Sequence, residues 1–277
     1  MLKLMYITNR PEVAKIAEDS GVDRIFIDME YIGKDERQAG MDTVKSHHTI
    51  SDIKKIRPII NNAELLVRVN PIHKKTNDYC SSFEEINHVI DAGADIIMLP
   101  MFRNAQEVKE FLSIVDHRVK TILLLENKDA VDNLEDILKL EGIDEVHIGL
   151  NDLHISYKKK FMFELLTDGT VKKICKTLKN KEIPFGFGGI ARIGHGALPA
   201  EYIIPEHYAL GSQMVILSRS FCDANKAENL ESIEVIFKEG IEKIRDKERE
   251  VSNYSEKEFE KIHSVVCKKI EEIVRGL

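Results

Sequence analysis

The sequence predicts an α/β fold, a (β/α)8 TIM barrel with a helical C-terminal extension. Three observations lead to this prediction. The chain has 277 residues, close to the roughly 250 that one such barrel needs. Short apolar runs alternate with charged, amphipathic stretches, as expected of a parallel sheet covered by helices. One type of joint, in which a helix ends in glycine before the next strand, recurs along the chain.

Eight apolar runs are the candidate strands, and each is usually followed by a polar stretch with helical spacing. They span residues 2–8, 24–29, 65–69, 96–100, 121–125, 146–150, 184–187 and 214–217. The joints before the second, fourth and sixth runs contain Gly21, Gly93 and Gly142. Eight such units favour closure into a barrel over an open sheet.

The chain divides into a catalytic barrel over 1–221 and a helical extension over 222–277. Beyond Phe221 the sequence is rich in Lys and Glu, and apolar residues recur at helical spacing. They are Ile233, Ile236, Phe237, Ile241, Ile244, Phe259, Ile262, Val266, Ile270 and Ile273. Such helices pack either on their own barrel or on a neighbouring subunit, and the sequence leaves both open.

Composition excludes several classes of function. The formal charge of −7 comes without a dense basic run, which argues against a nucleic-acid partner. Four widely spaced cysteines form no zinc cluster and no disulfide framework. The N-terminus lacks a secretory pattern, and no apolar run reaches about 18 residues, so we expect a cytoplasmic protein without a membrane span. A small-molecule ligand is the better expectation.

Two acidic residues directly follow apolar runs: Glu126 follows 121–125, and Asp152 lies just after 146–150. In a (β/α)8 barrel the active site lies at the C-terminal ends of the strands, where neighbouring strand ends meet. Carboxylates in these positions are candidate ligands of a divalent metal ion.

Arg68 lies at the end of the third run, where a buried guanidinium needs an anionic partner. That partner is either a substrate carboxylate or keto oxygen, or a barrel carboxylate such as Glu30. Asp28 and Glu30 end the second run, and alternation turns both to the same face. They are candidates to orient a base or to hold water on the metal, although an ionic network with Arg68 or Lys34 explains them nearly as well.

A long polar loop, 33–40, precedes His47 and His48. Long loops on the catalytic face often carry function, so His48 is a candidate acid–base residue. Residues 49–52 also read as a helix start, in which case the histidines flank a cap; we favour this reading for His47.

Two weaker signals lie further along the chain. The glycine-rich segment 184–190 either accommodates a phosphate or simply makes room in the barrel. His154, His195 and His207 have no ligand spacing, so we expect them on the surface or in loops.

Five segments together resemble the HpcH/HpaI aldolase and citrate lyase β-subunit family, a metal-dependent 2-keto-acid aldolase superfamily. They are 24–30, 66–70, 93–100, 124–127 and 148–153, and residues 210–217 resemble the family's final strand. The resemblance spans the second strand to the eighth, and its specificity lies in the order and spacing of the pieces.

The resemblance implies Mg²⁺ or Mn²⁺ held by Glu126 and Asp152, with pyruvate or a related 2-oxo acid bound to it. Arg68 matches the family arginine that contacts the keto or enolate oxygen. Main-chain N–H groups near Gly149, Asn151 and Asp152 would receive the substrate carboxylate. This fits the chemistry, because cleavage beyond a 2-oxo carbon leaves an enolate that a cation and Arg68 stabilise.

One departure stands out. Aldolases of this family have a His directly after the strand-two Asp-x-Glu, where this chain has Tyr31, here a candidate substrate contact. Either His48 or a metal-bound water replaces that base, or the chemistry is that of a citrate or malyl-CoA type acyl-CoA lyase. A non-catalytic metal- or ligand-binding barrel is the third alternative, and retention of Glu126, Asp152 and Arg68 argues against it. Relatives with a helical tail commonly assemble through it, so a homo-oligomer, a trimer or hexamer, is expected.

Overall fold

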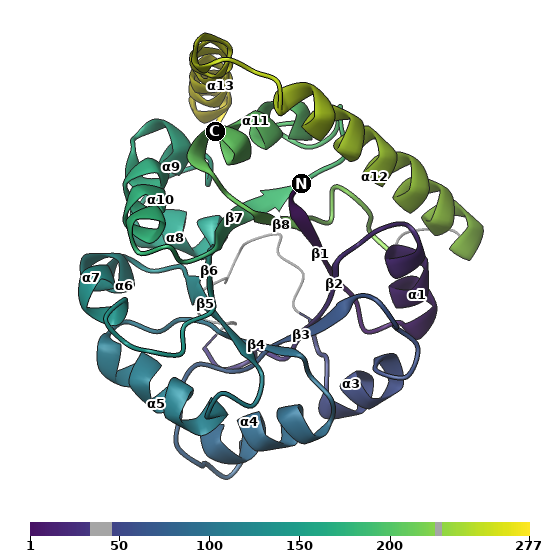
Figure 1. Ribbon diagram of the computed structural model, residues 1–277, viewed down its shortest axis with the longest axis vertical. Helices are drawn as coiled ribbons and strands as arrows, with labels where there is room; N and C mark the ends of the chain where they lie inside the picture. The colour runs from purple at the N-terminus through teal and green to yellow at the C-terminus, as the bar shows by residue number, and fades with distance from the viewer. Residues whose placement is uncertain (34–45, 225–228) are drawn as a thin grey trace.

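Eight parallel strands close into a barrel in the computed structural model, which describes residues 1–33, 46–224 and 229–277 (Figure 1). Each strand pairs with the next in the sequence, and β1 pairs with β8. The strands are β1 Lys3–Ile7, β2 Arg24–Asp28, β3 Glu64–Arg68, β4 Ile96–Leu99, β5 Lys120–Leu125, β6 Glu145–Ile148, β7 Phe185–Ile190 and β8 Met214–Leu217. The predicted fold class and all eight predicted strands are confirmed, with β7 longer than expected.

Helices surround the barrel on the outside (Figure 1). They are α1 Pro11–Asp19, α3 Ile50–Ile56, α4 Ser82–Asp91, α5 Ala105–Val115, α6 Lys128–Asp132, α7 Leu134–Ile137, α8 Leu150–Ser156, α9 Glu164–Thr167, α10 Thr170–Asn180, α11 Ala200–Leu210, α12 Leu230–Val251 and α13 Glu256–Gly276. No helix within the described ranges is long and apolar enough to cross a membrane. Lys34 and most of the predicted loop 33–40 lie outside the described residues.

The two C-terminal helices pack on the barrel of their own chain. α12 contacts α1 and α11, and α13 contacts α11 and α9. Phe237 and Ile244 of α12 and Ile270 of α13 are buried in the same core as the barrel helices. The helical reading of this region is confirmed, whereas its contact with a neighbouring subunit stays a prediction.

Alternation along the strands separates two apolar layers. One layer lies between the barrel and its helices and includes Leu123 and Leu125 of β5. The other is a smaller cluster inside the barrel: Met5, Phe26, Leu66, Ile96, Met98, Ile122, Leu124 and Met214. Glu126 continues the inward series of Ile122 and Leu124, so its side chain belongs to the barrel interior.

The predicted glycine joints are also confirmed. Gly21, Gly93 and Gly142 have φ angles of 99°, 102° and 92°. A residue with a side chain rarely adopts this left-handed conformation, so glycine lets each helix end sharply before the next strand.

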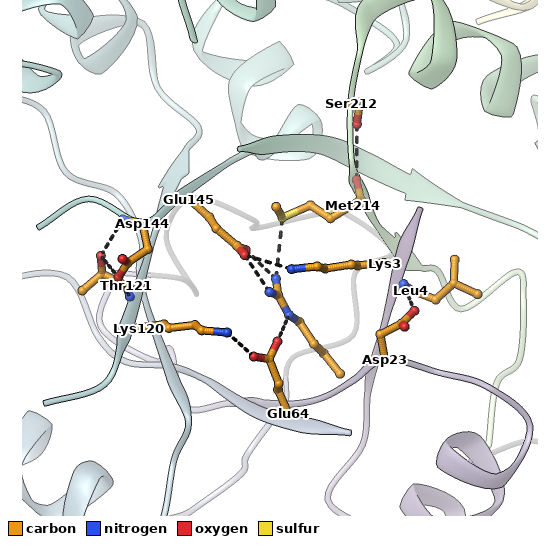
Figure 2. A network of polar contacts seen from close by, with 11 residues as sticks. Lys3, Leu4, Asp23, Glu64, Lys120, Thr121, Asp144, Glu145, Ser212 and Met214 are labelled. Atoms are coloured by element: carbon orange, nitrogen blue, oxygen red, sulfur yellow. Dashed lines mark hydrogen bonds and ion pairs between the residues drawn. The ribbon is translucent and has the colours of Figure 1, made fainter. Parts of the chain in front are cut away.

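A network of charges fills the N-terminal end of the barrel. The guanidinium of Arg24 donates to both carboxylate oxygens of Glu145 at 2.6 and 2.7 Å, and to Glu64 at 2.9 Å. Lys3 and Lys120 approach the same two carboxylates from the rim (Figure 2). Arg24 is fully buried, yet its charge is matched by this network.

Candidate active site

A cavity of about 650 Å³ opens at the C-terminal ends of the strands. Asp28, Arg68, Glu126, Gly149 and Asp152 line it together. The first four lie at the ends of β2, β3, β5 and β6, and the last lies in the first turn of α8, which follows β6. The closed barrel brings these strand ends to one face. The structure therefore places the main predicted site residues in one cavity.

Glu126 follows β5 and is buried, with 3% of its surface exposed. The main-chain N–H of Met101 donates to its Oε1 at 3.0 Å. On the other side, a Cβ on Gly149 would lie 2.9 Å from Glu126 Cβ and 3.0 Å from Oε2. Gly149 has a φ of −80°, which any residue adopts. The missing side chain, rather than backbone freedom, is what makes room for Glu126.

The electrostatics of Glu126 oppose its negative charge. Burial raises the pKa of its carboxyl well above the ordinary value, and Glu30 and Asp152 raise it further. Arg68 and the Met101 N–H lower the pKa, but by less. A carboxylate in such surroundings is stabilised by a bound cation.

The residues present fit a divalent metal ion. Within the described parts of the chain, no group of three or more His, Cys, Asp or Glu side chains forms a complete metal cage. Mg²⁺ does not need one, because it is usually held by one or two carboxylates together with substrate oxygens and water. Glu126, directly after β5, and Asp152, in the first turn of α8, both line the cavity and supply that donor set.

Arg68 is held in place by the acids of β2. Its Nε and Nη2 donate to the two oxygens of Asp28, each at 2.8 Å, and Nη1 lies 3.5 Å from Glu30 Oε2. Burial opposes the charge of Arg68, but Asp28 and Glu30 outweigh it and raise its pKa. Its main partner is thus Asp28, with Glu30 second. The guanidinium stays charged and lines the cavity.

His48 lies at the cavity next to the same acids. Its ring is buried, and Nδ1 accepts a hydrogen bond from the main-chain N–H of Asp28 at 3.0 Å. A neutral ring that accepts at Nδ1 has its proton on Nε2. The predicted helix start after His48 is confirmed: α3 begins there, and Thr49 and Asp52 form its capping box.

Tyr31 is not among the described residues that line the cavity. Its ring stacks on His47 with centroids 6.0 Å apart, and its main-chain N–H donates to Asn70 Oδ1 at 2.8 Å. Burial raises the pKa of the phenol to about 12. A substrate contact by Tyr31 stays a prediction, whereas Asn151 and Gly149 do line the cavity.

The sequence reasoning missed His147. This residue of β6 is fully buried, lines the cavity and hydrogen-bonds through Nε2 to the Gly188 carbonyl at 3.0 Å. Its position in the strand could have predicted this. Side chains alternate between the two faces of a strand, so His147 points to the same inward face as Gly149, whereas Val146 and Ile148 point outward.

The expectation for two other histidines was wrong. His207 is fully buried and His154 is 8% exposed, whereas His195 is exposed as expected. His207 hydrogen-bonds through Nδ1 to Ser212 Oγ at 2.7 Å and stacks on Phe187 at 3.8 Å. Nε2 of His207 is buried without a hydrogen-bond partner among the described residues. The spacing of single residues in the sequence does not reveal such a core position.

The glycines of β7 make room inside the protein. A Cβ on Gly186 would lie 2.2 Å from Met214, and one on Gly188 would lie 2.8 Å from Leu150 Cδ1. Packing therefore explains these two glycines without a bound phosphate.

Comparisons with known proteins agree with this fold. The sequence model described as HpcH/HpaI aldolase/citrate lyase matches residues 3–183. An HpcH/HpaI aldolase from Desulfitobacterium hafniense DCB-2 superposes with a TM-score of 0.59 at 15% identity, over 88% of this chain and 93% of that chain. An HpcH/HpaI aldolase/citrate lyase family protein from Burkholderia cenocepacia J2315 gives a TM-score of 0.62 at 15% identity, over 84% and 94%.

Citrate synthase SbnG is a further similar structure, with a TM-score of 0.57 at 17% identity over 78% of this chain and 86% of that chain. No curated protein matches the sequence. At these identities the structural likeness shows a shared fold.

Proposed function

The chain belongs to the HpcH/HpaI aldolase/citrate lyase family, and we propose that it is a divalent-metal-dependent carbon–carbon lyase acting on a 2-oxo acid. The observation that carries the proposal is the environment of Glu126. Its buried carboxylate shares a cavity of about 650 Å³ with Asp152 and Arg68, whose charges act on it, and its pKa is raised.

Each residue has a specific role in this proposal. Glu126 and Asp152 hold Mg²⁺ or Mn²⁺, and Arg68, fixed by Asp28 and Glu30, donates to the keto oxygen of the substrate. The main-chain N–H groups of Asn151 and Asp152 receive the substrate carboxylate. The ion supplies Lewis-acid stabilisation of negative charge on the substrate oxygens.

The reaction that suits these groups is cleavage of a 4-hydroxy-2-oxo acid. The bond between C3 and C4 breaks, and the proton of the 4-hydroxyl passes to a water molecule as that oxygen becomes a carbonyl. The electron pair of the broken bond forms an enolate, which takes a proton from water to give the released 2-oxo acid. Arg68 stabilises the charge that develops on the enolate oxygen. His48 in its neutral form has its proton on Nε2, so it acts there as a hydrogen-bond donor, and the base is water rather than this ring.

The test is proton NMR of pyruvate in D₂O with the purified protein, with and without Mg²⁺ or Mn²⁺. We expect metal-dependent loss of the methyl signal, because enolate formation exchanges these protons. Glu126→Gln should abolish the exchange, and Glu141→Gln, which changes an exposed carboxylate, should not.

Absence of exchange with either metal would overturn the proposal for pyruvate-type substrates. Cleavage of an acyl-CoA ester under the same conditions would instead assign the chain to the acyl-CoA lyase branch. Binding of metal and 2-oxo acid without any turnover would indicate a binding protein.

A further inference from the structure

The cavity has an ionic side, which the proposed reaction uses, and an apolar side, which it leaves without a role. The apolar side has a floor and a wall, built by Ile7, Leu150, Phe161, Phe163, Leu198 and Ile216. Ile7 of β1 and Ile216 of β8 form the floor and pack against the apolar cluster inside the barrel. Both line the cavity and are partly exposed, so apolar surface is open to a ligand there.

The wall is built by segments that follow β6 and β7. Phe161 and Phe163 pack edge to face with ring centroids 5.4 Å apart, and both line the cavity. Leu150 and Leu198 line it too and are only 1% and 2% exposed. Leu150 lies against Gly188, where a Cβ would be 2.8 Å from its Cδ1. Close packing holds these side chains in place, so the wall is a preformed apolar surface.

The charged residues around the apolar side offer little to an anionic group. Arg10 lines the cavity, but its Nε donates to Glu12 at 3.0 Å and its Nη1 donates to the Ala224 carbonyl at 2.9 Å. Arg219 and Asp223, which follow β8, add one charge of each sign to the lining. An anion buried on the apolar side would therefore lose its hydration without a net positive charge to offset the loss.

The cavity is larger than the reacting part of the substrate requires. Its volume of about 650 Å³ lies within the range of about 300–1,000 Å³ that is usual for pockets that bind drug-sized ligands. In the proposed function the carboxylate and keto groups lie on the ionic side, near Glu126 and Arg68. The group attached to C4 of the substrate has the apolar side left to it.

We propose that the group beyond C4 is an uncharged, apolar chain that lies on the apolar side, so that cleavage releases an apolar aldehyde or ketone. The proposal deepens the proposed function and rests on it for the 2-oxo acid end. Burial of such a chain favours binding by up to about fourfold for each methylene group. A chain of the same length that ends in a carboxylate is disfavoured, because its charge would be buried without a partner.

Three ligands test the proposal, and their affinities are measured by calorimetry in the presence of Mg²⁺. 2-Oxooctanoate and 2-oxooctanedioate have the same chain length and end in a methyl group and in a carboxylate. We expect wild type to bind 2-oxooctanoate at least about tenfold more tightly than the diacid. It should also bind 2-oxooctanoate at least about tenfold more tightly than 2-oxobutanoate, which lacks four of its methylene groups.

A change at the wall should alter this preference. Met162 lines the cavity beside Phe161 and is partly exposed, so Met162→Lys brings a cation to the wall. Its affinity for the diacid should rise about tenfold, the size expected for one hydrogen bond to a charged group. Val235→Lys is the control, because it adds the same charge at a residue that is 54% exposed on α12 and outside the described cavity lining. It should keep the preference of wild type.

Thermal unfolding shows whether the variants stay folded. Ala197→Lys repeats the test if Met162→Lys does not fold, since Ala197 is exposed in the loop after β7 and also lines the cavity.

The outcomes separate this proposal from the proposed function. A preference for 2-oxooctanoate that Met162→Lys or Ala197→Lys weakens and Val235→Lys keeps supports it, even if the protein catalyses no cleavage. Equal or tighter binding of the diacid by wild type overturns it, and so does a preference that the folded wall variants retain. Metal-dependent pyruvate exchange in the same preparation would then leave the proposed function standing by itself. If none of the three ligands binds, this proposal fails, and the exchange decides whether the proposed function fails with it.

Discussion

Glu145 at the N-terminal end of the barrel interior and Glu126 at its C-terminal end are both buried carboxylates, but their pKa values shift in opposite directions. At the N-terminal end, burial opposes the charge of Glu145 and Glu64, yet Arg24 and the nearby lysines outweigh it and lower both pKa values. At the C-terminal end, burial raises the pKa of Glu126, and the acids around it raise it further. The surroundings of Glu145 favour its ionised form, and those of Glu126 disfavour it.

The difference separates stability from function. Residues at the N-terminal face of such a barrel mainly support the fold, whereas the C-terminal face carries the active site. In the Arg24 network, the buried positive charge is paired with carboxylates of the same chain (Figure 2). At Glu126 the effect of Arg68 does not outweigh burial, and we propose that a bound cation supplies the compensation there.

The largest effect is expected from Glu126→Gln. Loss of a metal ligand should lower the rate of pyruvate exchange at least about 10³-fold, since a metal ion contributes several kcal/mol to such charge stabilisation. Urea unfolding without metal should show equal or greater stability, because the amide ends the repulsion from Glu30 and Asp152. A variant that is active, or that is strongly destabilised, would contradict the view that Glu126 serves function and not stability.

At the opposite end, Arg24→Met should destabilise the fold by about 3–5 kcal/mol, because it leaves Glu145 buried without its main partner. Lys3→Met is the control: Lys3 contacts the same Glu145 from an exposed position and should cost about 0–1 kcal/mol. Both values come from urea unfolding. Similar losses in the two variants would mean that burial does not set the strength of this network.

Gly149→Ala tests how tightly the site is built. The added methyl group would lie 2.9 Å from Glu126 Cβ, so the carboxylate must move. A displacement of this kind typically costs about 10²-fold in rate. We expect that loss in pyruvate exchange with little change in the unfolding midpoint, and an unchanged rate would show that the position of Glu126 is not critical.

The smallest effect concerns pH. Because the folded pKa of Glu145 lies below its ordinary value of 4.5, its stabilisation is present above about pH 4.5 and is lost as the pH falls through the folded pKa. Glu145→Gln should therefore be less stable than wild type by about 1–3 kcal/mol at pH 7, and the difference should shrink towards pH 3. A difference that does not depend on pH would exclude ionic pairing as its cause.

Much of the site follows from the sequence pattern. The two-residue period of β5 places Glu126 inside the barrel, and the ends of the apolar runs place Arg68 and Asp152 at its C-terminal face. The glycine joints follow from local backbone preference. These features depend on neighbours along the chain, so a single sequence is enough to predict them.

Contacts between strands and loops were decided only by the tertiary structure. The register of β2 against β3 pairs Asp28 with Arg68, so Asp28, rather than Glu30, is the closer partner. Glycine proved necessary at position 149 because a Cβ there would meet Glu126, and the hydrogen-bond partner of His147 was known only once Gly188 was placed beside it. The sequence by itself determined which face and which end of a strand each residue occupies, because those follow from local periodicity. Which residues meet there depends on barrel closure and register, which bring together segments far apart in the chain.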